Sequence, residues 1–289
     1  MRHARVLILL HALLVSPFPA ALAQSGTTGE PESARFDQLA RSFFEWRRVQ
    51  QPVSGDDIPR VERPDGWVPD WSPEAIEGYR AAYREYIRVL ERLDVEEWSV
   101  PRQVDARLLR AAMHRVPWEL DLLRAPHRNP LFYVQQTLGS VFELLLLSSP
   151  IDERRAENII LRFEQFPVTL KHARENLTEP VRPFAEATIE VLDGVDERLE
   201  QVETALDAHI PDELKRRFHS SISRATRSLE RYQKWLRSDL DEMRVSFAIG
   251  PDAYTWFLGN VALIPYTPNE LLAQGRQDWN RSVAWDVLE

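Results

Sequence analysis

The sequence predicts an all-α protein, a bundle or orthogonal array of many helices with a long antiparallel helical hairpin near residues 183–243. Apolar residues recur at three- and four-residue spacing through most of the chain, which is the pattern of amphipathic helices. No segment shows the strict alternation of a half-buried strand, and no repeat recurs at a fixed period. Ten glycines against twenty prolines also disfavour glycine-rich folds such as propeller blades.

The N-terminus has the three-part pattern of a secretory signal peptide, which we expect to cover residues 1–23. Arg2 and Arg5 precede an apolar run over residues 6–15. Ala21 and Ala23 occupy the two positions that a signal peptidase reads. The run is shorter than the roughly 20 apolar residues that span a bilayer, so an uncleaved anchor is the less favoured alternative. We therefore expect an exported protein, periplasmic or extracellular, with no transmembrane segment after cleavage.

A polar linker is predicted over residues 24–34 and a single helical domain over residues 35–289. Residues 51–72 hold too many prolines and glycines for a regular element. A loop of this length in a compact domain is usually functional or tightly packed. Its apolar residues predict that it lies along the body of the domain: Ile58, Val61, Trp67, Val68 and Trp71.

The first helices each carry an apolar stripe at helical spacing. One stripe begins at Phe36, a second follows the serine cap and first-turn proline at residues 72–73, and a third runs from Pro101. A proline within the third pattern predicts a kink or a break at Pro117. Residues 129–147 are apolar nearly all round, which predicts a central helix.

The next helix start is predicted at residues 149–152, which resemble a capping box with proline at the first helical position. We expect this helix to stop at Pro167 and residues 168–177 to form another short helix. One continuous apolar face is predicted over residues 183–208. Residues 211–243 carry apolar side chains at steps of three and four, a coiled-coil-like seam that would complete the hairpin.

The C-terminal region predicts a helix over residues 251–261 and a capping box at residues 267–270. The last helix carries an apolar stripe and has no C-terminal stop signal: Leu271, Leu272, Trp279, Val283 and Val287. A stripe of this kind needs a partner. We therefore expect a C-terminal half or a second chain to pack on residues 268–289, which would make this chain the N-terminal half of a larger protein.

Composition excludes several classes of function. A net charge of −9 and a pI near 5.4 disfavour nucleic-acid binding. The absence of cysteine excludes thiol nucleophiles, zinc ribbons, iron–sulfur clusters and a lipid-modified N-terminal cysteine, so no lipoprotein is expected. Neither a glycine-rich phosphate loop nor a Gly-x-Ser-x-Gly elbow is present.

No histidine pair has the spacing of a His-Glu-x-x-His zinc helix, because the histidines after the signal lie too far apart: His114, His127, His172, His209 and His219. The sequence therefore predicts no catalytic, cofactor-binding or metal-ligating residue within this chain.

Several weaker candidates are better explained as surface charge. His172 and Glu175 stand at i, i+3 and could share a metal, but this spacing is common on solvated helices. The acid pairs at residues 56–57 and 96–97 suit loop polarity better than catalysis. The Trp-Arg-Arg run at residues 46–48 could stack on bases, yet its acidic surroundings favour surface ion pairing.

Tryptophan is in excess, and most of these residues fall near predicted element ends: Trp67, Trp71, Trp98, Trp118, Trp256, Trp279 and Trp285. The default explanation is that each ring is buried at a corner while its N–H finds a partner. An aromatic-lined cleft for peptide or sugar is the functional alternative.

Six segments, in order, resemble the bacterial family known as domain of unknown function 885: residues 51–60 (QPVSGDDIPR), 63–67 (RPDGW), 103–110 (QVDARLLR), 118–121 (WELD), 128–133 (RNPLFY) and 264–272 (IPYTPNELL). The resemblance implies an exported, almost wholly helical protein related to zinc metallopeptidases that resemble helical carboxypeptidases. The family's His-Glu-x-x-His helix and further carboxylate lie downstream and have no counterpart here, so no catalytic residue carries over.

The resemblance therefore implies one wall of a substrate channel, with peptide as a possible substrate and zinc expected only with a downstream half. Such a chain would not be catalytic alone. The alternative is a free-standing exported helical module that binds a peptide or protein. The sequence leaves the substrate and the oligomeric state open.

Overall fold

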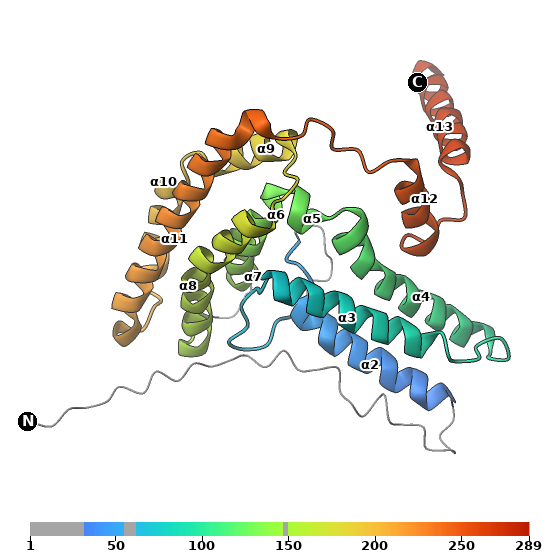
Figure 1. The fold of residues 1–289 in the computed structure, drawn as a ribbon, viewed down its shortest axis with the longest axis horizontal. Helices are drawn as coiled ribbons and strands as arrows, with labels where there is room; N and C mark the ends of the chain where they lie inside the picture. The colour runs from blue at the N-terminus through green and yellow to red at the C-terminus, as the bar shows by residue number, and fades with distance from the viewer. Residues whose placement is uncertain (1–31, 55–61, 147–149, 289) are drawn as a thin grey trace, which may run out of the picture.

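The computed structural model describes residues 32–54, 62–146 and 150–288, and these are almost wholly helical (Figure 1). The only bridge of β type among the described residues is an isolated one between Val181 and Arg244. The all-α prediction is therefore confirmed. The predicted signal peptide and the predicted apolar residues Ile58 and Val61 lie outside the described residues. In the described part of the chain, no helix has both the length and the apolar character needed to cross a bilayer.

Three helices form the N-terminal part of the molecule: α2 (Glu32–Gln50), α3 (Pro73–Leu90) and α4 (Val100–Pro117) (Figure 1). Helix α2 begins at Glu32, inside the segment predicted to be a linker, with an acidic residue in its first turn that suits the helix dipole. The predicted cap of α3 is confirmed, because the Ser72 side chain accepts a hydrogen bond from the Ala75 N–H at 3.2 Å. Helix α4 ends at the predicted proline.

A π-helical turn, η1 (Trp118–Leu122), leads from α4 into short helices α5 (Ala125–Arg128) and α6 (Pro130–Val134). The predicted central helix over residues 129–147 is not regular. A second π-helical turn, η2 (Gln135–Gly139), separates α6 from α7 (Ser140–Leu145). A π turn displaces backbone carbonyls from their usual partners, and side chains satisfy some of them here: the Thr137 hydroxyl donates to Tyr133 O at 2.8 Å and the Ser140 hydroxyl to Thr137 O at 2.7 Å.

Helix α8 (Glu153–Asn176) corrects two predictions. It runs without interruption through Pro167, and its N-cap is Asp152, whose side chain accepts from the Arg155 N–H at 2.8 Å. An internal proline costs a helix about 3 kcal/mol. Burial of α8 residues on both sides of Pro167, including Phe166 and Leu170, offsets this cost.

The predicted hairpin is present, but its first arm is broken. Helices α9 (Arg182–Leu192) and α10 (Val195–Asp207) meet at Gly194, whose φ of 66° is a conformation that glycine adopts without strain. Helix α11 (Asp212–Asp239) forms the second arm and carries the predicted apolar seam, followed by the short turn η3 (Leu240–Glu242).

The last two helices, α12 (Pro251–Asn260) and α13 (Pro268–Leu288), form an arm that stands away from the body, with α13 outermost (Figure 1). The predicted capping box of α13 is confirmed. The Thr267 N–H donates to the Glu270 carboxylate at 2.7 Å, and the Glu270 N–H donates to the Thr267 hydroxyl at 3.3 Å. Three of the predicted stripe residues of α13 are exposed instead of packing on the body: Leu272, Trp279 and Val283.

Two apolar cores hold the body together. The smaller core joins α2, α3 and α4: Phe36, Leu39, Phe43, Tyr86, Leu90, Ala106, Leu109 and Met113. The larger core gathers residues from the loop before α3, from α3, α4 and η1, and from α6 to α11, around α8 and α11. Trp46 and Tyr83 pack against both cores and therefore couple the two parts.

Buried tyrosines predict the alkaline limit of stability. Burial raises the pKa of Tyr83 to about 12 and raises the pKa of Tyr79, Tyr133 and Tyr232 further. The unfolded chain ionises its tyrosines near pH 10, so the folded state holds these protons more tightly. Their contribution to the free energy of unfolding is complete below pH 10 and is lost as the pH rises through the folded pKa values.

Urea unfolding at successive pH values should therefore show stability falling above pH 10, with tyrosinate absorbance appearing together with loss of helical circular dichroism. The chain in strong denaturant provides the control, because its tyrosines should all titrate near pH 10. Titration of every tyrosine near pH 10 in the fully helical protein would contradict the burial.

Candidate functional site

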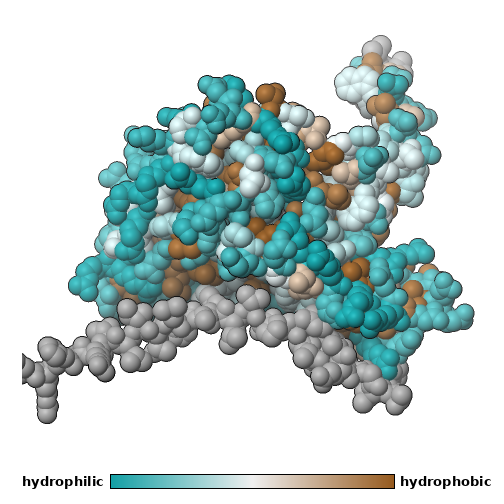
Figure 2. All heavy atoms as spheres, viewed as in Figure 1, coloured by the Kyte–Doolittle hydropathy of each residue, from teal (hydrophilic) through white to brown (hydrophobic). Residues whose placement is uncertain are grey.

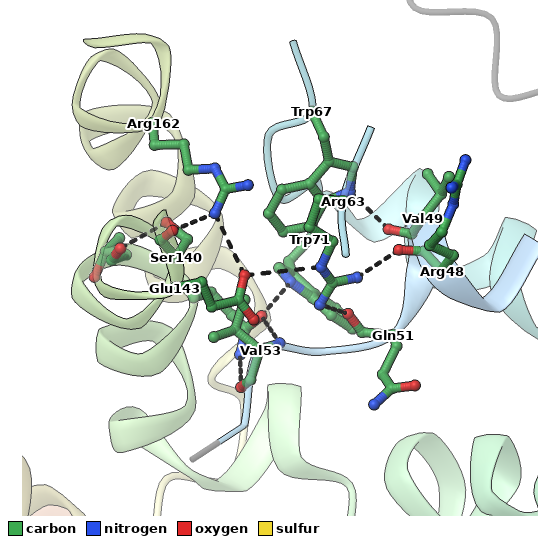
Figure 3. Close-up of polar contacts among 12 residues, drawn as sticks. Arg48, Val49, Gln51, Val53, Arg63, Trp67, Trp71, Ser140, Glu143 and Arg162 are labelled. Atoms are coloured by element: carbon green, nitrogen blue, oxygen red, sulfur yellow. Dashed lines mark hydrogen bonds and ion pairs between the residues drawn. The ribbon is translucent and has the colours of Figure 1, made fainter. Parts of the chain in front are cut away.

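A cluster of buried arginines and tryptophans lies where the loop of residues 62–71 meets α7 and α8 (Figure 3). Arg63 and Trp67 come from the loop, Glu143 from α7 and Arg162 from α8. The side chains of Arg63 and Arg162 are only 2% and 3% exposed, and Glu143 is 13% exposed. Charged groups are rarely buried to this degree unless they are paired.

Arg63 holds the end of α2 against the cluster. Its Nη1 donates to Arg48 O at 2.8 Å and its Nη2 donates to Gln51 O at 2.7 Å. These carbonyls lie at the C-terminus of the helix, where the helix dipole favours a cation. The predicted loop along the body is therefore anchored by its own arginine.

The Trp67 indole contacts both guanidinium groups. The Cζ atoms of Arg63 and Arg162 lie 4.3 Å and 4.8 Å from the centre of its ring. Its Nε1 donates to Val49 O at 2.8 Å. A cation over an aromatic face is worth about 0.5–2 kcal/mol and more when water is excluded, so Trp67 offsets part of the cost of burying two like charges.

Glu143 is the carboxylate that both arginines face. Its Oε2 lies 3.3 Å from Arg162 Nη1 and 3.9 Å from Arg63 Nε. Arg162 Nη1 also donates a short hydrogen bond to Ser140 O. Burial lowers the pKa of Arg162 to about 10; the Glu143 charge opposes this decrease and the Arg63 charge adds to it. The contacts of the cluster therefore keep positive charge buried although its removal from water costs free energy.

The π turn η2 forms the wall beside this cluster. The Gln136 side chain accepts from Val53 N–H at 2.8 Å and from Trp71 Nε1 at 3.1 Å, and it donates to Val53 O at 3.0 Å. Gly139 permits this close approach, because a Cβ atom there would meet Val53 Cγ1 at 3.1 Å. The described ends of the loop are therefore fixed by a buried amide, so the cluster is built on rigid elements.

A cavity of about 640 Å³ opens beside the cluster, within the size range of small-molecule sites. Arg63, Arg155, Arg162 and Glu143 are its buried charged residues. Arg155 is positioned from α8 by donating to Leu144 O at 2.5 Å, at the end of α7. The exposed charged residues of the cavity are Glu62, Asp65, Asp152 and Arg154. The cavity therefore has a mainly basic floor and a mainly acidic rim.

The structure does not bring the candidate metal pair together. Both His172 and Glu175 lie on α8, but the Glu175 carboxylate pairs with Lys171 at 3.0 Å. No three histidine or acidic side chains in the described residues are grouped as a metal would need. Of the two acid pairs, Glu96 and Glu97 are exposed, and residues 56–57 lie outside the described residues.

The Trp-Arg-Arg run divides among three environments. Trp46 is half-buried between the two cores, and Arg48 pairs with Glu45 at 3.4 Å on the surface. Arg47 is 5% exposed and binds Glu119 at 2.5 Å. Ion pairing is confirmed for this run, but the prediction of a surface location is wrong for Arg47, because α2 packs that side chain against η1.

The tryptophans do not gather in one cleft. Trp67 and Trp71 are buried with their N–H groups bonded, as the default explanation predicts. Trp98 packs edge-on against Phe36, with ring centroids 5.4 Å apart. Trp118 of η1 contacts Phe257 of α12, and Trp256 of α12 contacts His114 of α4. Trp279 and Trp285 are exposed on α13.

Sequence reasoning missed the arginine cluster. Two signals in the sequence point to it. Arg155 and Arg162 fall on the apolar face of α8, beside Ile159, and Glu143 interrupts an otherwise apolar run. A charge on a buried face needs a buried partner, but the pattern does not say which loop supplies it.

Comparison with known proteins places the chain in context. Residues 53–284 match a family described as bacterial protein of unknown function (DUF885). A solved structure described as "a putative lipoprotein of unknown function from Shewanella oneidensis" matches with a TM-score of 0.67 and 18% sequence identity. The match covers 85% of this chain and 46% of that one, so this chain spans about half the length of the similar structure. No curated protein matches the sequence.

Replacing Glu143 by Gln should destabilise the fold, because the two buried guanidinium groups would lose the carboxylate between them. Breaking a buried ion pair costs about 3–5 kcal/mol. The matched control is Glu186→Gln, which breaks an exposed pair with Arg182 at 2.9 Å and should cost at most about 1 kcal/mol. Urea unfolding monitored by circular dichroism measures both, and equal effects of the two substitutions would contradict the buried pairing.

Proposed function

Because the chain belongs to the bacterial DUF885 family, whose function is unknown, we propose that it is one half of an exported two-half helical protein. In this proposal the chain forms one wall of a peptide-binding channel and is not catalytic alone. The zinc ligands of a peptidase would come from the other half, since the described residues bring no such group together.

The observation that carries the proposal is the exposed apolar surface of the α12–α13 arm. Exposed fractions on α13 are 52% for Leu272, 70% for Trp279, 43% for Val283 and 65% for Trp285. Figure 2 shows apolar residues reaching the surface along this arm among hydrophilic neighbours. Large apolar side chains exposed together on one helix are typical of an interaction site in a folded protein.

The length of the similar solved structure supports the same proposal. It shares this fold over 85% of the present chain, and more than half of its own length lies outside the match. A second helical half packed on α12 and α13 would bury the exposed tryptophans. Export is supported by the N-terminal sequence pattern, with its basic start and apolar run.

The alternative is a free-standing exported module that binds a peptide or protein. The arginine-lined cavity favours it, because that cavity is formed entirely by residues of this chain. The two proposals differ in what they expect of the arm. A free-standing module should be monodisperse, whereas a half protein should self-associate or require its other half.

Sedimentation velocity of the purified chain should therefore show self-association that decreases in the double variant Trp279→Ala/Trp285→Ala. Removing two exposed rings should leave the helical circular dichroism unchanged, because neither ring contributes to a core. The matched control is Arg276→Ala/Asn280→Ala, which alters exposed polar residues of the same helix. A wild-type chain that is monomeric at all concentrations would favour the free-standing module.

Peptide hydrolysis provides the second test. We expect the purified chain, supplied with zinc, to show no hydrolysis of a mixed peptide library above a buffer blank, with or without a chelator. Mixing it with the separately expressed other half of a longer family member should produce chelator-sensitive hydrolysis. Zinc-dependent hydrolysis by the chain alone would contradict the proposal.

A further inference from the structure

The cavity beside Trp67 has a buried donor that the fold itself does not use. Arg162 Nη1 binds Ser140 O and Glu143, whereas its buried Nε has no hydrogen-bond partner among the described residues. A buried donor that has no acceptor costs free energy, and an oxyanion that reaches Nε from the cavity would supply the missing acceptor.

The charges that line the cavity indicate which oxyanion fits. Among the described residues, the buried part holds Arg63, Arg155 and Arg162 against the single carboxylate of Glu143. Arginine forks bind carboxylate and phosphate oxygens especially well. The unpartnered Nε of Arg162 therefore gives the buried part of the cavity a donor for an anionic group.

The rim has the opposite character. Glu62, Asp65 and Asp152 are exposed there, with Arg154 as the one exposed cation of the described lining. Arg154 already pairs with Asp65 at 3.2 Å. A multiply charged phosphate would be repelled at this entrance. A ligand with a cationic group next to its carboxylate complements both the acidic rim and the basic buried part of the cavity.

We propose that this cavity binds a small zwitterion of the amino-acid type, a free amino acid or a dipeptide. Its carboxylate would bind the Arg162 guanidinium, and its ammonium group would lie at the rim formed by Glu62, Asp65 and Asp152. The volume of about 640 Å³ accommodates either ligand. The lowered pKa of Arg162 agrees with this assignment, because a bound carboxylate would restore the stability of the charged form. The assignment is independent of whether a second half exists.

Isothermal titration calorimetry of the full chain with alanine, alanyl-alanine, alaninamide, N-acetylalanine and inorganic phosphate tests the proposal. We expect saturable binding of alanine or alanyl-alanine. The one that binds with higher affinity indicates whether the cavity is suited to an amino acid or to a dipeptide. Alaninamide lacks the carboxylate and should not bind. N-acetylalanine lacks the ammonium group and should bind more weakly, as should phosphate.

Variants locate the ligand. Arg162→Met should weaken binding at least about tenfold, as expected for loss of a charge-assisted hydrogen bond. If that variant unfolds, Arg162→Lys keeps a cation facing Glu143 but loses the guanidinium fork, and it should also bind the zwitterion more weakly. Asp65→Asn should weaken binding of the zwitterion but leave N-acetylalanine unaffected. Arg107→Met, which removes an exposed arginine of α4, is the matched control and should bind normally.

Three results would overturn the assignment. They are no saturable binding of either zwitterion to the wild-type chain, binding of alaninamide or phosphate as tight as that of alanine, and unchanged affinity in the folded Arg162 variants.

Discussion

The apolar contact between α8 and α11 is the interaction on which the rest of the structure depends. Phe163 and Phe166 of α8 are fully buried with Phe218 of α11, and the Phe163 and Phe218 ring centroids lie 6.5 Å apart. Burial of an aromatic side chain of this size contributes about 1.5–3 kcal/mol. This contact keeps α8 continuous through an internal proline and fixes the position of the side chains that α8 presents elsewhere.

The arginine cluster uses that fixed position. Arg162 lies one residue before Phe163, so the same helix that supplies the core also carries a buried cation to α7 and the loop. Trp67, Glu143 and the end of α2 offset the desolvation of the cluster, and the Nε of Arg162 still has no acceptor among the described residues. Proteins depart from local stability rules mainly at functional sites. The body of this chain therefore contains a rigid candidate site, whereas the α12–α13 arm contains an exposed surface.

Local signals in the sequence were sufficient for much of the fold. The serine cap at Ser72, the capping box at Thr267 and Glu270, and the seam of α11 each depend on residues within one or a few helical turns. The π turn η2 was not predicted, because a run that is apolar all round has no periodicity from which an extra residue per turn could be detected. Family membership also followed from short ordered segments, whereas the site did not.

The sequence by itself determined that the chain is helical, where most helices begin, and that α13 carries an unpartnered apolar stripe, since these properties arise from neighbouring residues. Only the tertiary structure decided that α8 continues through Pro167 and that Arg63, Glu143 and Arg162 meet. These residues come from three separate elements, and the local patterns around Glu143 and Arg162 indicate a need for buried partners without saying which element supplies them. Their burial is energetically possible only because α7, α8 and the loop bring opposite charges and an aromatic ring together in space.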